Sequence, residues 1–142
     1  MKEQSYSNHA RIVTGYHRVG TIGLLILIIG SVVNIYLATP ENLLSAALIF
    51  LSSLVLFIVA AYTRLFPLKA QDRAIRAEEN LRYYAMTGKL LPRELSVGQI
   101  VALRFASDEE FVELVNKAVS GNMTPKEIKQ AIRNWRADHH RV

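Results

Sequence analysis

Two long runs of apolar residues, 19–40 and 42–63, dominate the hydrophobic pattern of the N-terminal half of the chain. Neither run contains a charged side chain, and Glu41 is the single charge between them. A helix needs about 20 apolar residues to cross a bilayer, so each run is long enough to cross once. The connection at Glu41 is short, and the pattern therefore predicts an antiparallel hairpin of two spans, at about 19–39 and 42–63.

After the second run the apolar positions recur every three or four residues, which is typical of amphipathic helices. We expect Pro67 to break or kink the chain, and a separate helix to follow over residues 68–87 and end at Gly88. In this helix Glu78 and Arg82 are spaced for an ion pair. Its predicted buried face consists of Ala70, Ala74, Ala77, Leu81 and Tyr84.

Three short helices are predicted next, because three capping boxes precede apolar stretches. The boxes are Ser96 with Gln99, Ser107 with Glu110, and Thr124 with Glu127. In the last helix Ile128, Ile132 and Trp135 have the spacing of a buried stripe. No sustained alternation indicates a strand. The expected fold is all-α, with a two-helix transmembrane hairpin followed by a small cytosolic bundle of about four helices.

Positive charge predicts how the hairpin is oriented and how the chain is divided. Lysine and arginine side chains flank the two spans at Lys2, Arg11, Arg18, Arg64, Lys69, Arg73 and Arg76, whereas the connecting loop has none. Loops rich in lysine and arginine stay in the cytoplasm, so we expect both ends of the chain there. The predicted parts are a cytosolic arm at 1–18, the hairpin at 19–63 and a cytosolic all-helical region at 64–142.

Small residues in the two runs indicate where the spans contact each other. Gly23 and Gly30 lie on one side of the first predicted helix, and Ser53 and Ala60 lie on one side of the second. Small side chains let helices approach closely in lipid. We expect Gly30 near Ser52 or Ser53 and Gly23 near Ala60 within one hairpin, or else one of the stripes facing a second protomer.

The sequence offers no constellation that predicts catalysis. The chain has no cysteine, and we find no nucleophile–base pair, glycine-rich phosphate loop or zinc-ligand spacing. Arg104 and the acids Asp108, Glu109 and Glu110 form the densest charged group. These acids suit the N-terminal end of a helix better than a cation site, because a calcium loop needs spaced ligands and a turn glycine. We therefore expect a protein that is not an enzyme and has no cofactor or metal.

Four basic residues near the end, Lys126, Lys129, Arg133 and Arg136, have the spacing of one helical stripe. The commonest role of such a stripe is a solvated face. A membrane surface or a protein partner comes second, and nucleic acid is the least favoured ligand, with a net charge of only +5 for the chain.

Four sequence features carry a resemblance to a known family. They are Gln4-x-Tyr6-x-Asn8-His9, the stretch from Leu103 through Arg104-Phe105-Ala106-Ser107 to Glu110, the stretch from Pro125 to Lys129, and Asn134-Trp135-Arg136. With them the chain resembles an uncharacterised bacterial family of small two-span membrane proteins. The resemblance implies the architecture and a bacterial origin, and it assigns no activity.

Together these patterns predict a small integral inner-membrane protein. We expect its cytosolic helices to recruit or regulate a protein partner, or another copy of the chain, without catalysing a reaction. The alternative is an accessory subunit or oligomeric component of a membrane transporter. In either case the lipid bilayer is the first partner.

Overall fold

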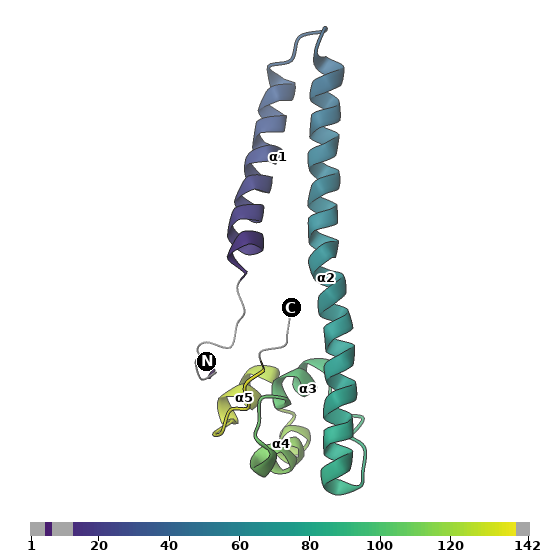
Figure 1. The fold of residues 1–142 in the computed structure, drawn as a ribbon, viewed down its shortest axis with the longest axis vertical. Coiled ribbons are helices and arrows are strands. Elements are labelled where there is room, and N and C mark those ends of the chain that lie inside the picture. Colours follow the sequence, from purple (N-terminus) through teal and green to yellow (C-terminus); the bar gives the residue numbers. More distant parts are fainter. Residues whose placement is uncertain (1–4, 7–12, 139–142) are drawn as a thin grey trace. The chain divides into compact units, whose positions relative to one another are not determined.

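A computed structural model describes residues 5–6 and 13–138 of the chain. This part contains five α-helices, a π-helical turn and no named strand, so the predicted all-α fold is confirmed (Figure 1). The elements are η1 (Gly15–Gly20), α1 (Thr21–Tyr36), α2 (Leu43–Thr87), α3 (Val97–Leu103), α4 (Asp108–Ser120) and α5 (Pro125–Ala131). The chain forms two compact units, which we call the hairpin (Arg11–Phe66) and the C-terminal unit (mainly Pro67–Val142).

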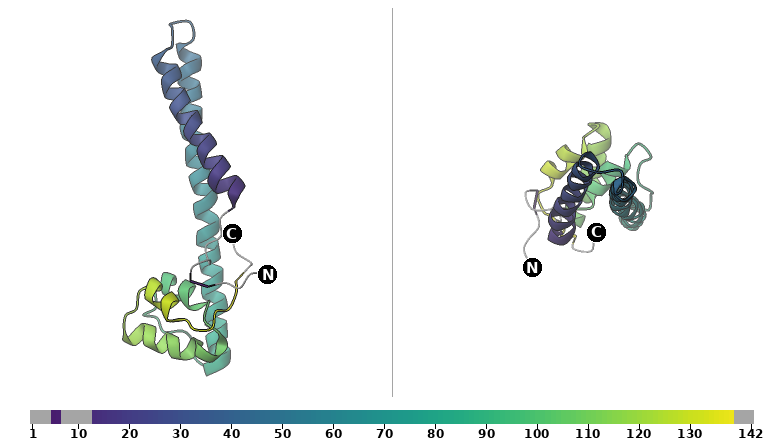
Figure 2. Two further views of the ribbon diagram at one scale, coloured as in Figure 1. Left: turned by 90° about the vertical axis from the view of Figure 1, so that its left-hand side faces the viewer. Right: turned by 90° about the horizontal axis from the view of Figure 1, so that it is seen from above.

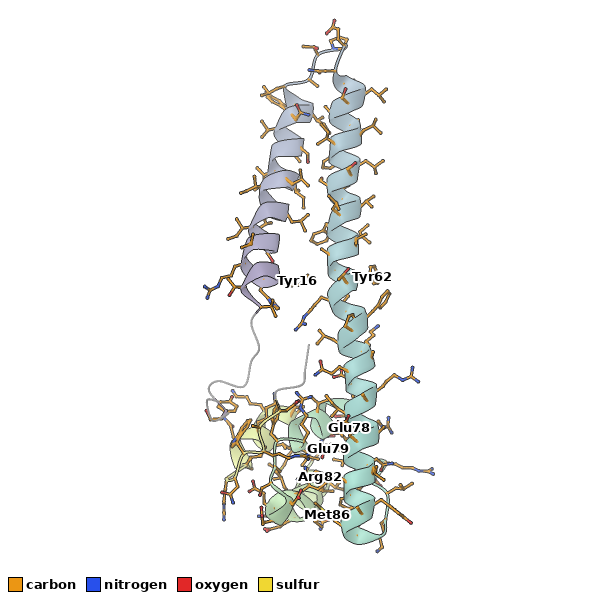
Figure 3. All side chains as sticks on the ribbon, viewed as in Figure 1. Tyr16, Tyr62, Glu78, Glu79, Arg82 and Met86 are labelled. Carbon is orange, nitrogen blue, oxygen red and sulfur yellow. The ribbon has the colours of Figure 1, made fainter. Side chains whose placement is uncertain are left out.

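The hairpin consists of η1, α1 and the first part of α2, joined by a short turn (Figure 2). In the turn the Asn42 side chain accepts a hydrogen bond from the Thr39 N–H at 2.8 Å, and the Asn42 carbonyl begins α2 by accepting from Ala46. Gly15–Tyr36 and Leu43–Thr87 are both long and apolar enough to cross a membrane. Large apolar side chains project outward along both helices (Figure 3), and Ile26 and Leu44 are 67% and 73% exposed.

The prediction that Pro67 breaks the chain between two helices is wrong, because α2 runs through it and is 45 residues long in total. A proline inside a helix lacks one N–H and strains the preceding turn, but it does not remove the bonds on either side. Residues on both sides of Pro67 favour a helix, so the second predicted span and the predicted helix at 68–87 are one element. The expected end is confirmed: Gly88 has a φ of 72°, and its N–H donates to the Tyr84 carbonyl.

The C-terminal unit has a hydrophobic core built by α2, α3, α4, α5 and the segments that connect them. Phe105, Phe111 and Val115 are fully buried within it. The other buried members are Tyr83, Leu95, Ile100, Ala102, Leu103, Ala106, Leu114, Ala118, Ile128 and Ile132. The aromatic rings contact one another: Tyr83 meets Phe111 edge-on, and Trp135 lies against Phe105 with ring centroids 5.0 Å apart.

The face of α2 that packs into this core differs from the predicted one. Ile75, Glu79 and Tyr83 are buried. The residues of the predicted face are all exposed, and we call them the outer stripe: Ala70, Ala74, Ala77, Leu81 and Tyr84. The prediction failed because it assigned charged residues to solvent, whereas Glu79 is buried with cationic partners.

Two of the three predicted capping boxes are confirmed, those of Ser96 with Gln99 and of Thr124 with Glu127. The third is wrong. Ser107 has the extended backbone of a helix cap, but its side chain accepts no capping hydrogen bond from a backbone N–H of α4. The Glu110 carboxylate instead accepts hydrogen bonds from the backbone N–H groups of Arg133 and Asn134, at 3.1 and 3.0 Å. A contact distant in the sequence has replaced the local one.

The last helix is shorter than its pattern indicates. α5 ends at Ala131, and Ile132 already has an extended backbone. Trp135 then pairs with Ala106 in an isolated antiparallel bridge, where the Arg136 N–H donates to the Phe105 carbonyl at 2.7 Å. The three predicted apolar residues still reach the core, but Ile128 does so from a helix and Trp135 from an extended segment.

Candidate functional site

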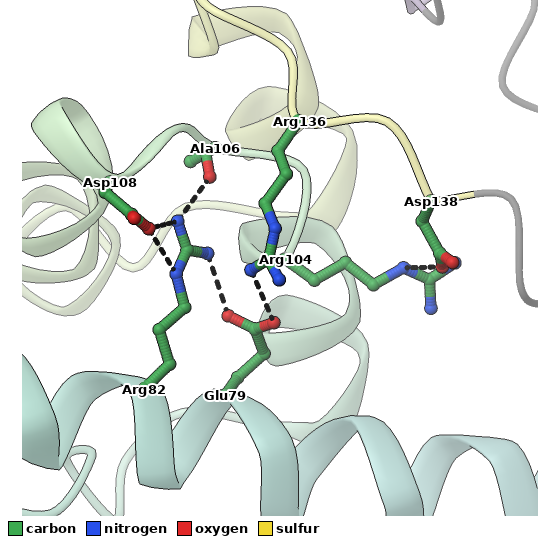
Figure 4. A network of polar contacts seen from close by, with 7 residues as sticks. All are labelled: Glu79, Arg82, Arg104, Ala106, Asp108, Arg136 and Asp138. Atoms are coloured by element: carbon green, nitrogen blue, oxygen red, sulfur yellow. Dashed lines mark hydrogen bonds and ion pairs between the residues drawn. The ribbon is translucent and has the colours of Figure 1, made fainter. Parts of the chain in front are cut away.

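Arg82 lies at the centre of the densest polar network in the described part of the C-terminal unit (Figure 4). Its Nη1 contacts Glu79 Oε2 at 3.0 Å, and its Nε donates to Asp108 Oδ1 at 2.8 Å. Its Nη2 also donates to the Ala106 carbonyl at 2.8 Å. The guanidinium lies over the Phe111 ring, 4.1 Å from the centroid. All three nitrogens of Arg82 are therefore engaged, and they join α2 to the start of α4.

Glu79 explains why this network is needed. Its carboxylate comes from the buried face of α2, and only 5% of the residue is exposed. A buried carboxylate is costly unless cations or donors replace its water. Arg82 supplies one cation, and Arg136 Nη1 approaches the other carboxylate oxygen at 3.7 Å. The sequence prediction paired Arg82 with Glu78, but the structure pairs it with Glu79 and Asp108.

A second ion pair joins α3 to the C-terminal segment. Arg104 is 8% exposed, and its Nε contacts Asp138 Oδ2 at 3.1 Å. Its guanidinium lies over the Phe105 ring, 4.6 Å from the centroid. The structure therefore pairs Arg104 with Asp138, although the sequence groups it with the acids at 108–110. Nothing in the local spacing indicates Asp138, because its contact depends on the extended segment after α5.

The three acids at 108–110 stabilise the first turn of α4, as expected for negative charge near a helix N-terminus. The Ser107 side chain is the main cause that lowers the pKa of Glu109, followed by a backbone N–H. Asp108 and Glu110 have separate partners, so the three carboxylates do not converge. Within the described residues no group of three histidine, cysteine, aspartate or glutamate side chains could hold a metal ion.

The four predicted basic residues do not form one stripe, because α5 ends before two of them. Lys126 is exposed on α5, and Lys129 lies 5.8 Å from the Phe105 ring centroid. Arg133 lines a groove of about 510 Å³ with glutamates of α4, and Arg136 faces Glu79. Two of the four charges thus lie beside carboxylates, which weakens any uniform basic surface. Whether these residues bind a partner stays a prediction.

The hairpin residues proposed for helix packing are placed unevenly. Ser53 is fully buried, and its hydroxyl lies 3.2 Å from that of Ser31 on α1. Ser31 takes the place that was predicted for Gly30. A Cβ atom added at Gly23 or Gly30 would meet nothing within 4 Å, so neither glycine marks a close approach. Sequence reasoning missed Ser31, although a serine within an apolar run was the available signal.

Away from the connecting turn, α1 and α2 separate, and an apolar groove of about 480 Å³ lies between them. Gly23 and Ala60 both line it, as do Leu27 and Leu56. The Tyr16 hydroxyl donates to the Ala60 carbonyl at 2.6 Å near the same end. The predicted proximity of Gly23 and Ala60 therefore occurs across a groove and not as tight packing.

A model of one protein family, described as a family of unknown function (DUF6526), matches residues 1–142. No curated protein and no solved structure matches the chain.

Proposed function

The chain belongs to the family DUF6526, and we propose that it is a membrane-tethered, non-catalytic module whose C-terminal unit binds a protein partner. The observation that carries this proposal is the reversed burial of the two units. In the hairpin large apolar side chains are exposed while Ser53 is buried, whereas in the C-terminal unit Phe105 and Phe111 are buried. Hydrocarbon solvates the first arrangement and water the second.

We propose that the hairpin spans the inner membrane of a bacterium, with both ends of the chain in the cytoplasm. The distribution of lysine and arginine supports this orientation, since these residues flank the spans and are missing from the loop. Reporter fusions after Phe66 and Val142 should both give cytoplasmic signals. A cysteine at Glu41 should react with an impermeant reagent from outside, and a periplasmic C-terminus would contradict the hairpin.

The internal contacts of the C-terminal unit support a binding role. Four of its charged residues are used internally: Arg82 pairs with Glu79, and Arg104 pairs with Asp138. Its helices α3 and α5 start at complete capping boxes. Such an arrangement fixes a surface in one shape, which lowers the entropic cost of binding a partner.

In-cell photo-crosslinking tests the proposed role directly. A photoreactive residue at Lys126, exposed on α5, should capture the same partner in repeated experiments at native expression levels. The matched control is Thr39 in the loop of the hairpin, which should not capture that protein. The absence of any reproducible partner at Lys126, together with turnover by the purified chain, would overturn the proposal.

A further inference from the structure

The outer stripe of α2 is an apolar feature of the C-terminal unit that no other part of the described unit covers. Leu81 and Tyr84 are 68% and 53% exposed. On a helix with about 100° per residue, the stripe lies about 180° from the buried residues Ile75, Glu79 and Tyr83. It therefore points away from the core that holds α2.

The spacing of the outer stripe is that of a coiled-coil seam. Its members, Ala70, Ala74, Ala77, Leu81 and Tyr84, follow one another at intervals of four, three, four and three residues. Alternating intervals of this kind place apolar residues at the a and d positions of a heptad, where they contact a second helix. Ala74 and Leu81 occupy a positions, and Ala70, Ala77 and Tyr84 occupy d positions.

Charges on the two sides of the stripe indicate that the second helix is α2 of another copy of this chain. Arg73 falls at a g position and Glu78 at the e position of the next heptad, which face each other across a parallel pair of identical helices. Both residues are exposed, and neither forms an ion pair with another described residue. In an antiparallel pair g positions face g positions and e positions face e positions, so Arg73 and Glu78 would not meet.

We propose that two copies of this chain associate in parallel through the outer stripe, with Arg73 of each copy paired with Glu78 of the other. The common direction of the two helices rests on the proposed function, because copies inserted in one membrane with one orientation present α2 in the same direction. The seam covers only two heptads, fewer than a free coiled coil usually needs. Here the core of the C-terminal unit already orders α2, so association does not have to form the helix.

Disulfide crosslinking tests the seam cleanly, because the chain has no cysteine of its own. In native membranes, single variants Ala70→Cys and Ala77→Cys should form disulfide-linked dimers at least about fivefold more than Ala131→Cys. Ala131 is a matched control, an exposed alanine on α5. Equal crosslinking at all three positions, or none at Ala70 and Ala77, would overturn the proposed dimer.

Direction is tested by coexpressing Ala70→Cys with Tyr84→Cys. A parallel pair gives dimers of each variant with itself, whereas an antiparallel pair gives mixed dimers. Mixed dimers in place of the Ala70 dimer would overturn the parallel arrangement.

The charge pair is tested separately. Arg73→Glu should reduce crosslinking through Ala77→Cys about threefold to tenfold, and adding Glu78→Arg should restore it. The control Arg76→Glu makes the same charge change on the same helix outside the g and e positions, and it should have little effect. A reduction that the second substitution does not restore would overturn the proposed contact between Arg73 and Glu78.

Failure of the dimer can be separated from failure of the proposed function. The same membranes are extracted with alkaline carbonate, which releases peripheral proteins and retains integral ones. A chain that resists extraction but does not crosslink at the stripe overturns the dimer alone. A chain that is released overturns the membrane tether, whatever the crosslinking shows.

Discussion

Side chains of the same kind differ in burial between the hairpin and the C-terminal unit. Phe57 of the hairpin is 53% exposed, whereas Phe111 of the C-terminal unit is fully buried. Ser53 is fully buried in the hairpin at a contact with another serine. The C-terminal unit buries charged residues only with partners, as for Glu79 and Arg82. Helix formation is common to both units, so the difference lies in what surrounds each helix.

This comparison shows that apolar spacing has a different meaning in each unit. In the C-terminal unit an apolar stripe on α3, α4 or α5 contacts a core. In the hairpin each helix carries apolar residues on all sides. Only small or polar side chains indicate where the two helices contact each other. The outer stripe of α2 follows neither rule within one copy of the chain, which is why a second copy is its proposed partner.

The largest expected difference between the units comes from truncating one phenylalanine in each of them. Phe111→Ala should destabilise the C-terminal unit by about 3–5 kcal/mol, because it leaves a cavity in a packed core. Urea unfolding of the full chain in mild detergent, followed by the fluorescence of Trp135, measures this change. Trp135 is the single tryptophan and lies against Phe105.

The matched hairpin variant is Phe57→Ala, at a side chain that is 53% exposed. It should change helical stability in an SDS titration by less than about 1 kcal/mol, since its surroundings differ little before and after the helices separate. Equal losses in the two variants would contradict the different surroundings proposed for the two units.

A second prediction concerns the charged residues of the C-terminal unit. Arg82→Met should lower the free energy of unfolding by about 3 kcal/mol, because it leaves the buried Glu79 without its nearest cation. Lys117→Met is the control, since Lys117 and Glu113 form an exposed pair that is worth at most about 1 kcal/mol. The same urea experiment compares them. Similar midpoints for both variants would show that burial of Glu79 does not matter.

The contact between the two hairpin helices gives a third prediction. Ser53→Leu should separate α1 and α2 at a cost of about 1–3 kcal/mol, because Ser53 is fully buried against Ser31. Gly30→Leu should leave the helices in place, since a Cβ atom there meets nothing within 4 Å. Spin labels on cysteines at Val32 and Leu51 report the distance between the helices. An increase with Gly30→Leu but not with Ser53→Leu would restore the packing predicted from the sequence.

Much of the fold was predictable because it depends on local chemistry. Apolar run length predicted the two long helices, Ser96 and Thr124 predicted the starts of α3 and α5, and Gly88 predicted the end of α2. Several of the errors share one cause, which is that contacts distant in the sequence override local spacing. Glu110 bonds to residues after α5 and not to the start of its own helix.

The candidate site was less predictable for the same reason. Arg82, Asp108 and Ala106 come together only after α4 folds back onto α2, so no spacing rule links them. Charged residues on α2 were expected to face water, and this expectation reversed the assignment of its buried face. In the hairpin the contact between Ser31 and Ser53 was missed. The apolar runs were used only for their length, and the contact between the helices was assigned to glycines because they are small.

The smallest expected effect is a pH dependence of the C-terminal unit. Glu127 closes the capping box of α5, and its carboxylate accepts hydrogen bonds from the Thr124 N–H at 2.7 Å and from the Thr124 hydroxyl at 2.8 Å. These two bonds, the backbone one first, lower the pKa of Glu127 below its usual value of 4.5. The unfolded chain therefore binds a proton at a higher pH than the folded one. The stabilisation by Glu127 is complete above about pH 4.5 and is lost as the pH falls through the folded pKa.

Glu127→Gln keeps an acceptor at this position but cannot titrate, so its free energy of unfolding should fall less than that of the original chain on acidification. Carboxyl-carbon NMR titration of the full chain in detergent, with the signal assigned by this variant, gives the folded pKa directly. A value at or above 4.5 would show that the box is not closed in solution.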